Sequence, residues 1–189
     1  MLKIYIGTIL LVIALIVCSL GPINPAYRVI DSQWIDHEST LVEADVQTIF
    51  NAIQQKDFAT FDNYLPGEIL SGGDGGAYLS RHQEILNDLA SDSIEIEQIQ
   101  LASPPDFYQS RSYDWAVLPT EAVLNYSDSK VAQHGFLLGV RLTNEPSWKY
   151  VDFTLNWQDA RLYVEQLYPD IPKSVFLPRC AAEYHQPAL

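Results

Sequence analysis

Residues 113–126 read YDWAVLPTEAVLNY, and residues 134–143 read HGFLLGVRLT. Both stretches are rich in β-branched, aromatic and other apolar side chains, which is typical of strands that lie inside a sheet. Residues 94–101 fit a strand with a bulge that ends at Ser103-Pro104-Pro105. Residues 148–157 and the shorter stretch 161–167 are also predicted as strands. We therefore expect an antiparallel sheet from residue 93 onward.

The region before this sheet has helical periodicity. Thr40 and Glu43 are spaced as a capping box, which predicts that the first helix begins there and runs over 40–55. A second helix is predicted over 57–65, with Asp57 as its cap, and a third over 77–90. The first helix carries one apolar stripe, formed by Val42, Val46, Ile49, Phe50 and Ile53.

The order of these elements predicts the fold class. Three helices followed by segregated strands indicate an α+β fold, with the helices packed on one face of a curved antiparallel sheet, like a cone. We divide the chain into a membrane anchor or signal segment (1–26), a tether (27–39), one α+β cone domain (40–178) and a C-terminal tail (179–189).

The N-terminal segment is expected to meet a membrane. Residues 4–20, IYIGTILLVIALIVCSL, are 17 residues without a charge, preceded by Lys3. That length is just enough to span a bilayer and is long for a cleaved signal core. The positive-inside rule then places the following domain outside the cytoplasm, in the periplasm of a cell with an inner membrane. Cleavage near residue 21, before Pro22, and lipidation at Cys18 remain alternatives.

Charge and motif content exclude several function classes. The residues after Ala26 hold 10 basic and 24 acidic side chains, a formal charge of −14, without a basic cluster, so nucleic acid is not an expected partner. The loop 71–76, SGGDGG, lacks the GKS or GKT ending of a P-loop. We predict no cofactor and no metal site, because the histidines have no metal-binding spacing and each is expected at the surface or as a cap: His37, His82, His134 and His185.

A hairpin between the two long C-terminal strands predicts an ion pair. If the turn 144–147 places Thr143 opposite Trp148, then Arg141 lies opposite Tyr150, and Asp152 is its diagonal neighbour on the same face. We expect Arg141 to pair with Asp152.

Several motifs in the second half of the chain resemble a known superfamily. They are Trp115-Ala116-Val117-Leu118-Pro119, the run 135–140 (GFLLGV), the run 146–152 (PSWKYVD), the run 167–173 (LYPDIPK) and Phe176-Leu177-Pro178. With the element order, they resemble the nuclear-transport-factor-2-like superfamily over residues 40 to about 168, and are similar to its exported bacterial members of unassigned role. The resemblance implies a cone of three helices wrapped by a bent sheet, a fold that hosts enzymes, binding proteins and oligomerisation modules.

The leading functional expectation is a membrane-anchored extracytoplasmic domain that binds a small apolar ligand or a partner protein. Aromatic residues on strands fill cores or line concave apolar pockets, so the proposed ligand-binding residues are Tyr113, Trp115, Arg141 and Asp152. A homodimer formed through the sheet is compatible with this role.

The alternative is a small isomerase or lyase, as the ketosteroid isomerases of the superfamily would imply. Asp114, Glu121 and Asp152 are the acids available on strands, and none of them matches an isomerase motif residue by residue. No catalytic residue is therefore assigned, and a non-enzymatic role is favoured. The two functions differ in one observable, because an enzyme of this type needs a buried carboxyl at the pocket floor with a raised pKa.

Overall fold

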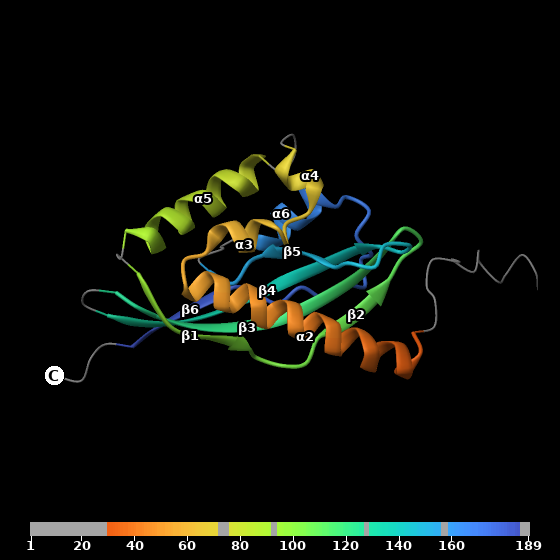
Figure 1. Ribbon diagram of the computed structural model, residues 1–189, viewed down its shortest axis with the longest axis horizontal. Helices are drawn as coiled ribbons and strands as arrows, with labels where there is room; N and C mark the ends of the chain where they lie inside the picture. The colour runs from red at the N-terminus through yellow and green to blue at the C-terminus, as the bar shows by residue number, and fades with distance from the viewer. Residues whose placement is uncertain (1–29, 72–75, 92–93, 127–128, 156–158, 186–189) are drawn as a thin grey trace, which may run out of the picture.

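The protein is an α+β domain in which helices precede and cover a curled antiparallel sheet (Figure 1). This computed structural model describes residues 30–71, 76–91, 94–126, 129–155 and 159–185. The predicted fold class is confirmed at this level. The elements are α2 Ser32–Gln54, α3 Phe58–Asp62, α4 Gly67–Leu70, α5 Gly76–Ala90, β1 Glu95–Leu101, β2 Asp106–Gln109, β3 Tyr113–Asn125, β4 Lys130–Leu142, β5 Lys149–Asp152, α6 Ala160–Leu167 and β6 Ala181–His185.

Two long strands form the centre of the sheet. β3 and β4 are 13 residues each and pair along their whole length, from Tyr113 opposite Leu142 to Asn125 opposite Lys130. On its outer edge, β3 pairs with β2 over 114–117 and with β1 over 120–125. On its own outer edge, β4 pairs with β6 over 130–134 and with β5 over 137–140. Both long strands change partner at the same level, where Pro119 lies opposite Phe136.

The residues at this level explain why both partners change there. The Pro119 carbonyl accepts a hydrogen bond from the Ala102 amide on the outer side of β3, so the missing Pro119 N–H also belongs to that side. On β4, a Cβ on Gly135 would lie 2.2 Å from the Phe153 carbonyl oxygen. The chain leaving β5 therefore crosses Gly135 closely, and only glycine leaves it room.

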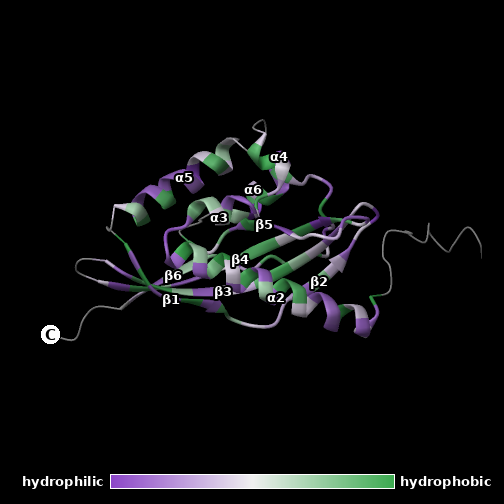
Figure 2. Ribbon diagram, viewed as in Figure 1, coloured by the Kyte–Doolittle hydropathy of each residue, from purple (hydrophilic) through white to green (hydrophobic). Residues whose placement is uncertain are grey.

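Helix α2 is longer than predicted. Its N-cap is Asp31, whose side chain accepts the Gln33 amide, and the helix begins at Ser32, eight residues before Thr40. The predicted capping box at Thr40 is wrong, because the Thr40 hydroxyl instead donates to the Asp36 carbonyl inside the helix. The apolar stripe from Val42 to Ile53 is buried as predicted, and Figure 2 shows apolar and polar residues alternating along α2.

The other helices and the first strand mostly follow the sequence patterns. Asp57 caps α3 by accepting the Thr60 amide, α5 covers the predicted 77–90, and β1 has its bulge between Ile96 and Gln98. α4 was not predicted, because Pro66-Gly67 suggested only an end to the preceding helix, although proline is also well suited to precede a helix.

Three predictions about the sheet are wrong. Residues 161–167 form α6 and not a strand; Ala160, Val164 and Leu167 are spaced one helical turn apart and turn inward. β5 ends at Asp152, well short of Trp157, which lies outside the described residues. β2 and β6 were not predicted, and β6 lies in what was expected to be a C-terminal tail.

The two faces of the sheet are covered by different segments. α2 crosses the face that carries Arg141, which bonds to Glu38 of α2, while Trp115 on the opposite face packs on Tyr168, just after α6. Among the described residues no helix combines the length and apolar character needed to cross a bilayer. The predicted anchor, residues 4–20, lies outside the described residues.

Candidate functional site

The four residues proposed as ligand contacts do not form one site. Tyr113 and Trp115 pack side by side, with ring centroids 5.3 Å apart, and both rings lie edge-on to Tyr168. Arg141 and Asp152 lie on the other face, with Asp152 opposite Leu137, four residues along β4 from Arg141. At about 3.3 Å per residue, their backbones are about 13 Å apart. A ligand role for any of these residues stays a prediction.

The predicted ion pair between Arg141 and Asp152 is wrong. The β4–β5 register places Gly139, not Arg141, opposite Tyr150. This slip of two residues keeps Asp152 on the expected face, because side chains alternate with a period of two, but moves it out of reach. The turn sequence did not reveal the slip, since a longer connection between the strands satisfies the same apolar pattern.

Arg141 instead belongs to a buried ion cluster. Its Nη1 and Nη2 atoms donate to the Glu38 carboxylate at 2.9 and 3.1 Å, and Nη2 also donates to Asp114 Oδ2 at 2.9 Å. The three side chains are 8%, 6% and 4% exposed. Glu38 was missed because it lay in the predicted tether; the helical spacing from Glu38 to Val42 was the signal that could have placed it.

Two tryptophans complete the surroundings of the guanidinium. The Trp148 indole N–H donates to Glu38 at 2.8 Å, and the Arg141 Cζ atom lies 4.5 Å from the Trp148 ring centroid and 6.0 Å from that of Trp34. Burial lowers the pKa of Arg141, but the hydrogen bonds and charges of Glu38 and Asp114 outweigh it and raise the pKa above its ordinary value. The cluster joins the first half of α2 to the sheet.

The buried Asp152 makes hydrogen bonds that fix the backbone at the end of β5. Its carboxylate accepts the Thr154 amide at 2.7 Å, and its own amide donates to the Tyr78 hydroxyl, which in turn donates to the Asp152 carbonyl. Burial raises the pKa of Asp152, although the bonds from Thr154 lower it. These contacts hold the end of β5 to α5 and begin the crossing over Gly135.

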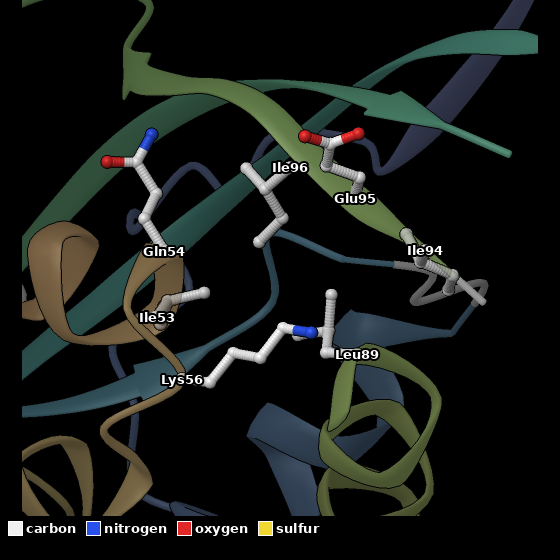
Figure 3. Close-up of a pocket in the computed structure, with 7 residues that line it drawn as sticks. All are labelled: Ile53, Gln54, Lys56, Leu89, Ile94, Glu95 and Ile96. Carbon is white, nitrogen blue, oxygen red and sulfur yellow. The ribbon is translucent and has the colours of Figure 1, made fainter. Parts of the chain in front are cut away.

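The described residues form a cleft of about 410 Å³ where the ends of α2 and α5 approach the start of β1 (Figure 3). The side chains of Ile53, Ile96, Leu89 and Lys56 extend toward a common space, whereas the Gln54 amide and the Glu95 carboxylate point away from it. Ile94 completes the lining. An apolar wall with one cation and a polar rim is the usual composition of a small-molecule site.

Lys56 reaches this cleft through an unusual backbone conformation. It has a φ of 58°, the only positive φ of a non-glycine residue among the described residues. The Lys56 amide donates to the Ile53 carbonyl and the Asp57 amide to the Ala52 carbonyl, which is the Schellman arrangement that ends α2. Glycine is the usual residue at this position, and a side chain there costs about 1 kcal/mol.

The sequence patterns did not reveal this cleft as a site. Ile53 and Leu89 were interpreted as core residues, and Lys56 as an ordinary residue between two helices. The cleft depends on how the α5 end meets β1, which is a tertiary feature. The one local signal was a lysine directly before the α3 cap Asp57, where glycine is expected to end a helix.

The histidines and acids do not assemble a metal site in the part of the chain that the structure describes. His82 is buried and not at the surface as predicted: its ring stacks on Phe61 at 4.8 Å and on Tyr78 at 5.6 Å. Neither ring nitrogen has a hydrogen-bond partner among the residues that the structure describes. Burial lowers the pKa of His82 to about 4. The periodicity of α5 places His82 on its apolar face, and that signal was overlooked.

Comparison with known proteins adds no relative. No family model, no curated protein and no solved structure matches this chain.

Proposed function

We propose that this chain is a membrane-anchored extracytoplasmic domain that binds a small apolar ligand in the cleft between α2, α5 and β1. The observation that carries the proposal is Lys56, which holds a strained backbone conformation at the wall of a cleft into which Ile53, Leu89 and Ile96 also extend. Residues in strained conformations cluster at functional sites. A volume of about 410 Å³ lies within the usual range of ligand pockets.

The composition of the wall indicates the kind of ligand. Three side chains that extend into the cleft, Ile53, Leu89 and Ile96, are apolar and favour a hydrocarbon or aromatic body. Lys56 favours a polar or anionic end on the same molecule, because a carboxylate near an ammonium offsets part of its loss of water.

The cone-like fold and the nuclear-transport-factor-2-like resemblance are part of this proposal. Helices that precede and cover a curled sheet support it. Ligand sites of cone-shaped folds lie inside the concave space between helices and sheet, and the cleft opens at the end of that space, near the start of β1.

The binding proposal is tested with the neutral fluorescent probe N-phenyl-1-naphthylamine and the full chain in a non-ionic detergent. Ile96→Trp fills the cleft and should weaken probe binding at least tenfold. Gln98→Trp is the matched control, because Gln98 lies on the same strand but pairs with Val123 on the opposite face. Equal binding by the two variants and the parent chain would remove the cleft as the site.

The anchor has its own test. If residues 4–20 are retained in the inner membrane, mass spectrometry of the membrane-extracted protein should give the mass of the uncleaved chain. A soluble form that begins near Tyr27, or a form acylated at Cys18, contradicts retention.

The isomerase or lyase function ranks second. The Asp152 carboxyl is buried and its pKa is raised, as such an enzyme requires. Asp152 does not line the cleft between α2, α5 and β1, so that cleft gives substrate no access to it. Turnover of a 3-oxo-Δ5-steroid that is lost in Asp152→Asn, with thermal stability unchanged, would reverse this ranking.

A further inference from the structure

A second cleft lies far along the chain from the first, between α6 and the segment 177–180. Its volume is about 480 Å³. One wall is the first turn of α6 and the other is the extended segment that leads into β6. The lining residues are Asp159, Ala160, Arg161, Leu162, Leu177, Pro178, Arg179 and Cys180.

Each wall carries one arginine. Arg161 is 60% exposed and pairs with Glu165 on its own helix at 2.8 Å, and such an exposed pair is worth about 0–1 kcal/mol. Arg179 makes no ion pair within the described ranges. Two arginines therefore line one cleft in a chain whose formal charge is −13.

The other lining groups do not cancel this positive charge. Asp159 is the one carboxylate among them, and it stands at the start of α6, where the helix dipole offsets part of its charge. Burial, with a smaller contribution from Asp152, raises the pKa of the Cys180 thiol to about 11, so this thiol is neutral near pH 7. The lining residues themselves, two arginines and one aspartate, carry one net positive charge, and Glu165, which pairs with Arg161, lies outside the lining.

Large apolar side chains at or beside the cleft are exposed. Leu162, which lines it, is 55% exposed, and Phe176, next to the lining residue Leu177, is 69% exposed. Ala160 and Pro178 also line the cleft. Exposed apolar groups beside two cations match a molecule that is charged at one end and apolar at the other.

We propose that this second cleft binds an amphiphile with an anionic head, a phosphate or a carboxylate, held between Arg161 and Arg179, with its alkyl part on Leu162 and Leu177. Arginine suits this role because its planar guanidinium forms paired hydrogen bonds to such groups. The proposal does not depend on the first cleft or its ligand.

The test uses three probes on the full chain in a non-ionic detergent: hexyl phosphate, inorganic phosphate and hexan-1-ol. Binding is measured by NMR titration of the amide signals of residues 160–162, 177, 179 and 180. Hexyl phosphate should bind at least tenfold more tightly than either other probe. Equal affinity for inorganic phosphate would overturn the apolar half of the proposal, and equal affinity for hexan-1-ol would overturn the anionic half.

Variants separate the two halves further. The double variant Arg161→Gln with Arg179→Gln should weaken hexyl phosphate binding at least tenfold, and Leu162→Ser should weaken it while leaving inorganic phosphate unchanged. Arg81→Gln and Leu70→Ser are matched controls, because Arg81 forms a similar exposed pair on α5 and Leu70 is 52% exposed on α4. Equal losses in test and control variants would overturn the site. The five changed side chains are exposed or, in the case of Arg81, half-buried, and thermal unfolding confirms that each variant is folded.

Discussion

Arg141 and His82 are both buried polar residues, and the fold accommodates them in opposite ways. Arg141 keeps its charge and is surrounded by Glu38, Asp114 and the Trp148 indole. His82 lies between two aromatic rings, and neither of its nitrogens has a hydrogen-bond partner in the described part of the chain. The buried guanidinium stays charged because carboxylates from α2 and β3 surround it, together with the Trp148 ring before β5. The buried imidazole has no such partners and is therefore neutral near pH 7.

The largest expected effect is on the Arg141 cluster. Arg141→Met leaves two buried carboxylates without their cation and should lower the free energy of unfolding by about 3–5 kcal/mol. Arg81→Met, at an exposed pair, should cost at most about 1 kcal/mol. Both values come from thermal or urea unfolding. In a double-mutant cycle, Arg141→Met and Asp152→Asn should show coupling near zero, because the two side chains do not meet. If Arg141→Met lowers the free energy of unfolding by no more than Arg81→Met does, the buried cluster does not stabilise the fold as argued.

The second effect is a pH dependence at His82. Its pKa is about 4 in the folded state, whereas the ordinary pKa of a histidine in water is 6.5, so the unfolded state binds the extra proton first as the pH falls. Stability is fully present above pH 6.5 and is lost progressively toward pH 4, by about 3 kcal/mol at most. His82→Phe keeps the aromatic stacking, and its free energy of unfolding should depend less on pH between pH 6.5 and pH 4. An unchanged pH profile in His82→Phe would remove His82 as its cause.

The smallest effect concerns Lys56, which is exposed but strained. Lys56→Gly relieves the left-handed backbone conformation and should raise stability by about 0.5–1 kcal/mol. The same change removes the cation from the first cleft, so a probe with a carboxylate should lose more affinity than the neutral naphthylamine. Lys56→Ala, which keeps the strain and removes the cation, is the control. Stability that falls in Lys56→Gly would show that the lysine contacts outweigh the strain.

Local periodicity predicted much of the secondary structure, because a stripe such as Val42 to Ile53 is buried only in a helix. It failed where partners decide the outcome. Residues 181–185 form a strand because β5 pairs only with 137–140 of β4, so the edge at 130–134 is available. The sequence AAEYH has no pattern that predicts this pairing. The start of α2 was missed because the buried side of its first turns is an ionic residue, Glu38, and not an apolar one.

The candidate sites were harder to predict for the same reason. Arg141 was singled out correctly as unusual, but its partners come from segments 27 and 103 residues away in the chain. Both clefts form between elements whose contact is not encoded in any short pattern. Individual chemical groups are visible in a sequence, whereas the surfaces that they share depend on register and on how helices end.

The change of partner at Pro119 and Gly135 has a consequence for self-association. The described outer strands of the sheet are short, seven residues in β1, five in β6 and four in β2 and β5. Part of the β5 edge is also occupied, since the Tyr150 amide donates to the Tyr64 carbonyl. A second copy that added a strand at an edge could form only a few backbone hydrogen bonds. Short edge strands of this kind are one way in which natural sheets resist edge-to-edge aggregation. A homodimer of this chain would therefore not form by extending the sheet from strand to strand, and side chains, not backbone groups, would choose the partner.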